Sequence, residues 1–303
     1  MTKSKRKALP PKLIIKLGKF VWTTLWHIMM SKLAPRNQAG EYIRPSSEFR
    51  NFVSHKEGEV YQPEQGRYKL IVGLSCPWAH RTLVVRALKG LEEAISVTIV
   101  SPSPVDGGWV FNSEEAGCRT LAEFYEQAQP DYTGRSTVPV LWDSQTKTIV
   151  NNESSEIIVM LNSEFNDFAK NPSLDLYPEE IKDKIDFWND KIYPAVNNGV
   201  YRCGFAQTQA AYNQVCDELF TTLFRFDAVY YGIFKCNRRR IKDYENMRAY
   251  VADIYQMNGV ASTCDVDSVK QDYYGNLFPL NPGGIIPATP DISYMSLTHG
   301  RGL

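Results

Sequence analysis

The order of apolar segments between residues 68 and 165 constrains the fold more than any other feature of this sequence. Apolar residues at every third or fourth position predict helices over 79–91 and 154–165. Short apolar runs predict four strands, over 68–73, 96–100, 138–142 and 148–150. The order is therefore strand, helix, strand, a long connection over 101–137, then strand, strand and helix. This order predicts a mixed sheet with helices on both faces.

That arrangement is typical of a thioredoxin-like domain, which we expect over residues 67–170. A linker at 171–178 precedes a second half in which the apolar spacing is helical. We expect a helical domain over 171–303, whose tail at 275–290 is too rich in proline and glycine for a long helix. The predicted helices of this half cover 181–192, 210–226 and 242–257. The expected fold class is therefore α/β plus all-α, with a thioredoxin-like domain followed by a helical one.

Residues 1–66 are expected to form a basic N-terminal segment and an extended connection. The first 34 residues contain eight lysines or arginines, no acid and several apolar groups. A signal peptide is disfavoured because Lys16 and Lys19 interrupt the apolar run. We expect a helix that packs on the protein or on a second subunit. A helix in weak contact with a membrane surface through residues 1–34 is the alternative.

Composition argues against several classes of function. The 303 residues carry 34 basic and 34 acidic side chains, and this zero net charge argues against a general nucleic-acid binder. The six cysteines are far apart in the sequence, which excludes a Cys-x-x-Cys redox pair and a clustered metal site. We therefore expect a cytoplasmic protein with reduced thiols and no metal.

Cys76 is the strongest candidate for a catalytic residue. It lies in Gly73-Leu-Ser-Cys-Pro-Trp-Ala-His80, where a predicted strand ends and a helix begins with Pro77 at its first position. Free backbone N–H groups and the helix dipole lower the pKa of a thiol at such a position, and Arg81 and His80 add positive potential. Without a nearby second cysteine, the thiolate forms a mixed disulfide with an external thiol. A buried, unreactive cysteine beside a tight turn is the alternative.

Two further segments fit the binding of a ligand. Pro139 lies in an apolar strand, where proline removes a ladder hydrogen bond. It is either at a strand edge or start, or it follows a cis bond that turns the backbone of Val138 toward a ligand. Glu153 and Ser154 open a predicted helix, which is typical of capping. They also fit the capture of a ligand's carboxylate and amine.

Together these segments resemble the thioredoxin-like domain of the cysteine-type, omega-like glutathione transferases, and in particular the Xi class, the glutathionyl-hydroquinone reductases. The resemblance runs from about residue 38 to residue 300. The motifs that carry it are Cys-Pro-Trp-Ala at 76–79, Gly-Gly-Trp-Val-Phe at 107–111, Gly-Arg-Ser-Thr-Val-Pro-Val-Leu-Trp-Asp at 134–143, Asn-Glu-Ser-Ser-Glu-Ile-Ile at 152–158, Asn-Asn-Gly-Val-Tyr-Arg-Cys-Gly-Phe-Ala at 197–206, Arg-Phe-Asp-Ala-Val-Tyr at 225–230, Phe-Lys-Cys-Asn at 234–237 and Asn-Pro-Gly-Gly-Ile-Ile-Pro at 281–287.

The resemblance implies a function for each matching residue. Cys76 resembles the nucleophile, and Tyr201 matches the tyrosine assigned to proton transfer. Tyr230 and Tyr273 match tyrosines that line the hydroquinone pocket. The glutathione contacts that the resemblance implies are Trp109, Arg135, Ser136, Thr137, Val138, Glu153 and Ser154. It also implies glutathione as co-substrate, small aromatic glutathione conjugates as substrates and a homodimer as the assembly.

The helical half departs from the family's pattern at one place. In the family, a loop and a capped helix start normally separate the helix near 212–220 from the helix that carries Arg-Phe-Asp at 225–227. Here residues 217–220 run directly into 221–226, and the usual Thr-Glu-Ala-Asp capping box is missing. The helical domain is therefore predicted to be shortened near 218–222.

The resemblance predicts an enzyme that removes glutathione from glutathionyl-hydroquinones through a mixed disulfide between Cys76 and glutathione. Two alternatives stay open. Thiol transfer or dehydroascorbate reduction, as in other cysteine-type glutathione transferases, needs Cys76 but not the tyrosines. A non-catalytic protein at a membrane surface is the alternative from a different class, and the basic N-terminal segment and the shortened helical domain are the reasons for it.

Overall fold

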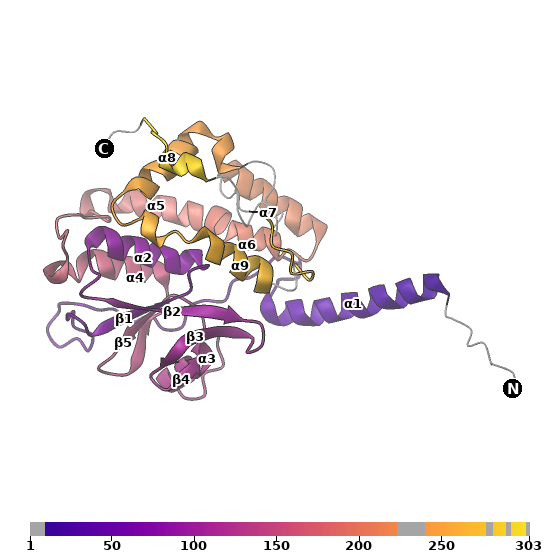
Figure 1. The fold of residues 1–303 in the computed structure, drawn as a ribbon, viewed down its shortest axis with the longest axis horizontal. Coiled ribbons are helices and arrows are strands. Elements are labelled where there is room, and N and C mark those ends of the chain that lie inside the picture. Colours follow the sequence, from indigo (N-terminus) through magenta and orange to yellow (C-terminus); the bar gives the residue numbers. More distant parts are fainter. Residues whose placement is uncertain (1–9, 223–239, 277–280, 289–291, 301–303) are drawn as a thin grey trace.

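The computed structural model describes residues 10–222, 240–276, 281–288 and 292–300. They form a sheet with helices on both faces, a helical domain stacked on one of these layers, and a long helix, α1 (Pro11–Leu33), that projects from the body (Figure 1). Among the described helices, none combines the length and the apolar character that crossing a bilayer requires. The predicted fold class, α/β plus all-α, is confirmed.

Within the described chain, the sheet contains six strands in the order β4-β3-β2-β1-β5-β6. β1 is parallel to β2, and every other neighbouring pair is antiparallel. The register pairs Leu70 with Val97 on one side and with Leu141 on the other, which places β1 at the buried centre of the sheet. The strands are β1 (Tyr68–Val72), β2 (Ser96–Ser103), β3 (Gly108–Glu115), β4 (Cys118–Thr120), β5 (Val140–Asp143) and β6 (Thr148–Asn151).

Three helices cover the two faces of the sheet. Helices α2 (Pro77–Lys89) and α4 (Ser154–Ser163) lie between the sheet and the helical domain, and α3 (Leu121–Ala128) lies on the opposite face (Figure 1). Pro77 suits the first position of α2 because its missing N–H would be unpaired there. Gly90 ends the helix with a φ of 67°, which glycine adopts without strain. These two residues fix where α2 begins and ends.

The predicted connection over 101–137 is not a plain loop. It contains the end of β2, the strands β3 and β4, and helix α3. The sequence carries a signal for α3, since Thr120 Oγ1 accepts the N–H of Glu123 at 3.2 Å and Glu123 Oε2 accepts the N–H of Thr120 at 3.0 Å. This is a capping box, Thr-x-x-Glu, which the spacing of apolar residues does not indicate. β3 contains only one short apolar run, at 109–111, which explains why its periodicity is weak.

Residues 35–66 contain no helix and run beside the edge strand β6. The N–H of Asn51 donates to the carbonyl of Val150 at 3.0 Å, and the N–H of Asn152 donates to the carbonyl of Phe49 at 3.0 Å. This pairing fixes the segment against the sheet. It also brings residues from far upstream in the sequence to the starts of α2 and α4.

The described part of the helical domain contains α5 (Lys182–Ile192), α6 (Gly199–Gly204), α7 (Gln209–Thr222), α8 (Glu245–Gln256) and α9 (Val266–Asn276). The helical path does not stop at Pro194 as the sequence predicts, because a π-helical turn, Tyr193–Asn197, continues from α5 toward α6. Helix α7 continues without interruption through residues 218–222. Residues 223–239, which include Tyr230, lie outside the described residues, so the predicted shortening stays a prediction.

Tyr201 lies where three parts of the chain meet. It packs against an apolar cluster of α6 and α7, and also against a second cluster formed by Met30, Ala34 and Tyr42. Phe205 packs against both clusters as well. The end of α1, the extended segment and the helical domain are therefore joined around one tyrosine.

Candidate active site

Cys76 is the residue immediately before α2. Its N–H donates to the carbonyl of Gly73 at 3.0 Å, and its carbonyl accepts the N–H of His80 at 2.9 Å. Its side chain is partly exposed, and Sγ lies 3.4 Å from the carbonyl of Val138, to which it donates a hydrogen bond. The thiol is therefore held at the N-terminus of a helix.

Two opposing effects set the pKa of the Cys76 thiol. Burial raises this pKa, whereas the backbone N–H groups of Ala79 and Trp78 and the charges of Arg44 and Arg81 lower it. The effect of burial is the larger one, so the pKa lies above its usual value. The prediction of a lowered pKa is therefore wrong. The sequence shows that the thiol precedes a helix, but it does not show the loss of solvent around the thiol.

Of the two basic residues predicted to act on the thiol, Arg81 does so and His80 points elsewhere. The Arg81 guanidinium donates to Ser154 Oγ at 2.6 and 2.9 Å. The ring of His80 faces the helical domain, where Nε2 lies 2.8 Å from Thr263 Oγ1. Only one of the two residues thus contributes positive potential to Cys76.

The bond between Val138 and Pro139 is cis, as one of the two interpretations of this proline predicts. Pro139 also directly precedes β5, which lies between β1 and β6 and is not an edge strand. The carbonyl of Val138 faces the thiol of Cys76. The next carbonyl upstream, that of Thr137, accepts the hydroxyl of Tyr125 at 2.8 Å.

Trp109 reaches this region from β3. Its six-membered ring lies directly against Gly73, so close that a Cβ atom at Gly73 would overlap it. Arg135 is exposed and its Nη1 donates to the hydroxyl of Tyr42 at 3.4 Å, while Ser136 is half-buried beside it. Trp109 therefore lies beside the loop that carries Cys76, and Arg135 lies beside the extended segment.

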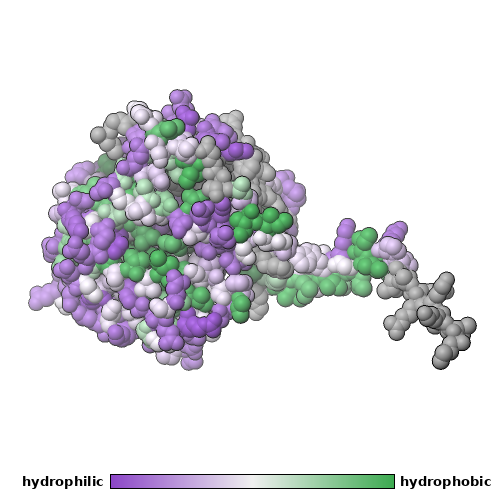
Figure 2. All heavy atoms as spheres, viewed as in Figure 1, coloured by the Kyte–Doolittle hydropathy of each residue, from purple (hydrophilic) through white to green (hydrophobic). Residues whose placement is uncertain are grey.

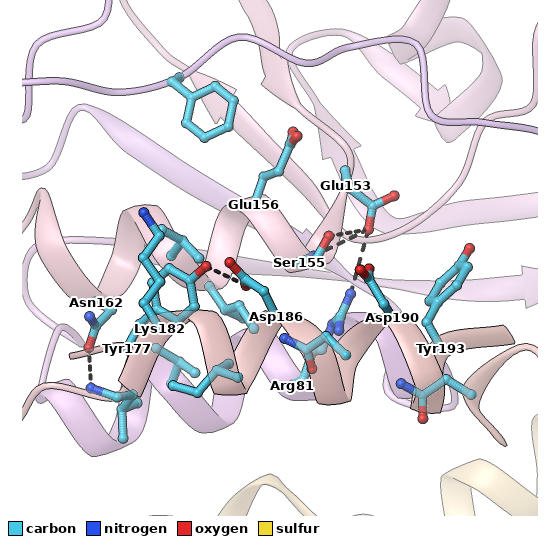
Figure 3. Close-up of a pocket in the computed structure, with 18 of the residues that line it drawn as sticks. Arg81, Glu153, Ser155, Glu156, Asn162, Tyr177, Lys182, Asp186, Asp190 and Tyr193 are labelled. Atoms are coloured by element: carbon cyan, nitrogen blue, oxygen red, sulfur yellow. Dashed lines mark hydrogen bonds and ion pairs between the residues drawn. The ribbon is translucent and has the colours of Figure 1, made fainter. Parts of the chain in front are cut away.

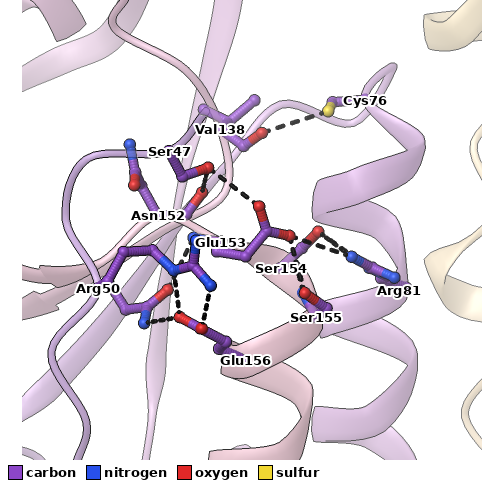
Figure 4. A network of polar contacts seen from close by, with 11 residues as sticks. Ser47, Arg50, Cys76, Arg81, Val138, Asn152, Glu153, Ser154, Ser155 and Glu156 are labelled. Atoms are coloured by element: carbon purple, nitrogen blue, oxygen red, sulfur yellow. Dashed lines mark hydrogen bonds and ion pairs between the residues drawn. The ribbon is translucent and has the colours of Figure 1, made fainter. Parts of the chain in front are cut away.

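Glu153 and Ser154 form a polar network at the start of α4 (Figure 4). Glu153 accepts the N–H of Ser155 at 3.2 Å and the hydroxyl of Ser47 at 3.0 Å. Arg81 Nη2 lies 3.5 Å from Glu153 Oε1, in addition to its hydrogen bonds with Ser154. The capping interpretation of Glu153 is confirmed. The same side chain also belongs to an ionic group close to Cys76, as capture of a charged ligand requires.

Tyr201 and Tyr273, which are 72 residues apart, come together. Their hydroxyl oxygens are 3.3 Å apart. The ring of Tyr201 stacks on that of Trp78, with centroids 6.4 Å apart and an angle of 24° between planes. Because Trp78 is two residues from Cys76, this stack places the ring of Tyr201 beside the first turn of α2. Tyr230, the third predicted tyrosine, lies outside the described residues.

Four residues near the thiol were not predicted. The Arg44 guanidinium lies over both Trp78 and Tyr201, with Cζ 4.7 and 5.7 Å from their ring centroids. No motif marks Arg44 or its neighbour Ser47, because only the path of residues 35–66 brings them here. The others are Tyr193, in the π-helical turn, and Asp272, which hydrogen-bonds to Ser75 and whose pKa burial raises.

Two pockets lie beside the residues that surround Cys76. A narrow crevice of about 20 Å³ is lined by Arg44, Trp78, Tyr193 and residues 137–139 and 152–154, with Ser47. It has room for about one water molecule. A wider cleft of about 890 Å³ lies between α4 and α5 and shares Glu153 and Tyr193 with the crevice (Figure 3). The wider cleft is lined neither by Cys76 nor by Tyr201 or Tyr273.

Trp78 is 9% exposed, and its indole N–H is one of two buried side-chain polar groups without a hydrogen-bond partner among the described residues. Such a donor is costly unless a ligand or water accepts it.

No group of His, Cys, Asp or Glu in the described ranges is arranged to hold a metal ion.

Comparison with known sequences places the chain among the glutathione transferases. Residues 75–164 match the family model of the glutathione S-transferase N-terminal domain. The glutathionyl-hydroquinone reductase PcpF of Sphingobium chlorophenolicum is 40% identical over 89% of this chain and 94% of its own. The glutathionyl-hydroquinone reductase YqjG of Escherichia coli is 38% identical over 93% of this chain and 96% of its own.

Solved structures agree with this assignment. The glutathione S-transferase Xi of Phanerochaete chrysosporium has a TM-score of 0.80 and 39% identity, covering 84% of this chain and 95% of its own. The glutathione-bound structure of YqjG from Escherichia coli K-12 has a TM-score of 0.77 and 38% identity, covering 84% and 96%. This chain belongs to the Xi class of glutathione transferases. The family that the sequence motifs indicate is thus confirmed.

In this Xi-class chain, Gly73→Ala is expected to displace the Trp109 ring and to lower the free energy of unfolding by about 1–3 kcal/mol, because the new methyl group overlaps the ring. Gly108→Ala is the matched control, since nothing lies within 4 Å of a Cβ there. Thermal or chemical denaturation compares the two variants. Equal stability of both would contradict the packing of Trp109 on Gly73.

Arg44→Gln is expected to raise the pKa of Cys76 further, because the positive charge of Arg44 lowers it in the wild type. Less thiolate is then present at pH 7, and alkylation of Cys76 by iodoacetamide slows several-fold. Peptide mass spectrometry over a pH series follows this reaction. Arg44→Lys should restore most of the rate, and Lys56→Gln, an exposed change in the same segment, should leave it unaltered.

Proposed function

We propose that this chain is a glutathionyl-hydroquinone reductase. The position of Cys76 carries the proposal: its thiol lies at the N-terminus of α2, two residues from the Trp78 ring that stacks on Tyr201. The ring of Tyr201, whose hydroxyl is 3.3 Å from that of Tyr273, thus lies beside the first turn of the helix that follows the thiol. Two relatives that align with most of the chain carry this name, which supports the same activity.

Glutathione is the co-substrate in this proposal, and one homologous structure is named as glutathione-bound. The backbone of Val138, beside Cys76, pairs with the cysteinyl part of glutathione. Glu153 and Ser154 bind its amine and a carboxylate at the start of α4. The remaining proposed contacts are Trp109, Arg135, Ser136 and Thr137.

The crevice beside these residues opens when glutathione binds. At about 20 Å³ it is far smaller than a tripeptide. Arg44 and Tyr193 line it, and both belong to segments outside the sheet, so their side chains can move without disturbing the sheet. The buried indole N–H of Trp78 then gains a polar group to which it can donate.

The first step is attack of the Cys76 thiolate on the glutathione sulfur of a glutathionyl-hydroquinone. A sulfur–sulfur bond forms, and the bond between that sulfur and the aromatic carbon breaks. The aromatic carbon takes the electron pair and needs a proton, which Tyr201 supplies as a general acid. Tyr273, 3.3 Å away, stabilises the resulting phenolate by a hydrogen bond, and water returns the proton to Tyr201.

In the second step the enzyme is regenerated. A second glutathione, as its thiolate, attacks the glutathione sulfur of the mixed disulfide, and Cys76 leaves as a thiolate. Oxidised glutathione is released. The two electrons that reduce the aromatic carbon therefore come from the pair of glutathione sulfurs, and no other reductant is needed.

The raised pKa of Cys76 gives the attack a distinct pH dependence. Below that pKa, the fraction of thiolate rises about tenfold per pH unit. Attack by Cys76 therefore accelerates as pH increases from neutral to alkaline. The N–H groups of α2 and the charges of Arg44 and Arg81 limit the rise in pKa and stabilise Cys76 when it leaves as an anion.

The alternative activities have less support. Thiol transfer and dehydroascorbate reduction would use Cys76 but would leave the contact between Tyr201 and Tyr273 without a function. A flat phenolic substrate uses that pair and the ring of Trp78. A non-catalytic membrane protein does not account for relatives that are 38–40% identical and named as reductases.

The proposal includes a homodimer in the cytoplasm. Phe187 and Trp188 on α5 are 55% and 58% exposed, which is unusual for large apolar side chains unless a partner covers them. The five described cysteines are free thiols, which fits a reducing compartment. Sedimentation velocity of the wild type and of Trp188→Lys tests the dimer.

Replacing the nucleophile tests the proposed function directly. Cys76→Ala is expected to reduce turnover of a glutathionyl-hydroquinone at least about a thousandfold, because no other described cysteine lies at a helix N-terminus facing Val138. Cys118→Ala, a buried thiol in β4, is the control and should retain turnover. Intact-mass analysis should find one bound glutathione in the control and none in Cys76→Ala. Undiminished turnover in Cys76→Ala would exclude the mechanism.

The role of Tyr201 has a more selective test. Tyr201→Phe is expected to slow removal of glutathione from an aromatic carbon by about 10²–10⁴-fold, because it removes the acid. Reduction of a glutathione mixed disulfide breaks no bond to carbon, so its rate should change little. The matched control is Tyr212→Phe on α7. An equal loss with both substrates would assign Tyr201 a structural role instead.

A further inference from the structure

Helix α1 has two chemically different faces. It begins at Pro11 and ends at Leu33, which corresponds to a length of about 34 Å. At 100° per residue, one face carries exposed polar side chains, and these are Lys12, Lys16, Lys19, Thr23 and His27. The opposite face carries aliphatic side chains, and these are Ile14, Leu17, Val21, Leu25 and Ile28. We call this second set the aliphatic stripe.

The aliphatic stripe is not covered by the body of the protein. Its five side chains are between 47% and 59% exposed. The helix projects away from the sheet and the helical domain, and Figure 2 shows hydrophobic residues along its lower side, well beyond the body. Only the last turns of α1 are fixed, where Met30 is buried and Trp26 packs against the same cluster as Tyr201. None of the described residues of the body covers the stripe, so its burial needs a surface other than these residues.

The charges on α1 indicate what covers the stripe. Residues 1–34 contain eight lysines or arginines and no acid, although the whole chain has zero net charge. A second copy would bring an equally cationic helix to the contact, which is unfavourable. An anionic lipid surface instead accepts the aliphatic stripe in its acyl boundary and pairs the lysines with its headgroups.

We propose that α1 binds the surface of an anionic lipid bilayer, lying parallel to it with the aliphatic stripe inserted. The helix does not cross the bilayer, in keeping with the absence of a membrane-spanning helix among the described residues. Because the base of α1 packs near Tyr201, binding holds the tyrosine pair close to the lipid surface. This position lets apolar aromatic substrates reach the tyrosine pair from the lipid, a consequence that rests on the proposed function.

Sedimentation with vesicles tests lipid binding without any use of turnover. The full-length protein is mixed with vesicles of phosphatidylcholine alone or with phosphatidylglycerol added, at low and high salt. We expect binding to the anionic vesicles that decreases with salt, and much weaker binding to the neutral ones. Replacing Lys12, Lys16 and Lys19 by Ala should weaken binding on the order of a hundredfold, about fivefold per charge.

A matched pair of variants separates the stripe from the opposite face. Leu17→Asn with Val21→Asn should abolish sedimentation with anionic vesicles, whereas Thr23→Asn with His27→Asn should retain it. Circular dichroism of each variant checks that the helix content is unchanged. Equal binding by both variants would overturn the proposal. A second result would also overturn it. If the stripe variant still binds vesicles but sediments as a monomer where the wild type sediments as a dimer, the stripe packs against a second copy of the chain. Neither result depends on whether the chain reduces glutathionyl-hydroquinones.

Discussion

The balance between burial and positive potential at the thiol of Cys76 is the constraint on which the rest of the site depends. Burial raises the pKa of this thiol, and the N–H groups of α2 with Arg44 and Arg81 lower it. The thiol lies at the N-terminus of α2, and Sγ donates a hydrogen bond to the carbonyl of Val138. The site therefore holds less thiolate at neutral pH than an unperturbed cysteine would, and the groups that lower the pKa limit this loss.

Three distant parts of the sequence meet around the first turn of α2. The sheet domain supplies Cys76 and the carbonyl of Val138, the helical domain supplies Tyr201 and Tyr273, and the extended segment supplies Arg44. Arg44 lies over the rings of both Trp78 and Tyr201, so one guanidinium connects all three parts. The position of Arg44 therefore has two effects: its charge lowers the pKa of the Cys76 thiol, and its guanidinium contacts both aromatic rings.

Helix α1 extends this organisation beyond the globular body. Near its end, Met30 and Ala34 are buried with Tyr42, and Tyr201 packs against the same cluster, whereas the aliphatic stripe and the first lysines of α1 are exposed. A surface that binds the exposed part of α1 is thereby connected mechanically to the tyrosine pair. The base of α1 thus packs beside Tyr201, while its exposed aliphatic stripe runs along the part of the helix that projects from the body.

The sequence by itself determined the fold class, the helix start at Pro77 and the family, because each depends on local patterns: apolar spacing, Cys-Pro before a helix, and motifs of contiguous residues. It left the cis bond before Pro139 as one of two interpretations, and the structure decided between them. It missed β3 because its apolar run is short, and α3 because a capping box is not an apolar period. Only the tertiary structure decided the direction of the Cys76 pKa shift, the orientation of His80 away from the thiol, and the presence of Arg44 and Tyr193 beside it. These depend on desolvation and on contacts between segments far apart in the chain, which no local pattern records.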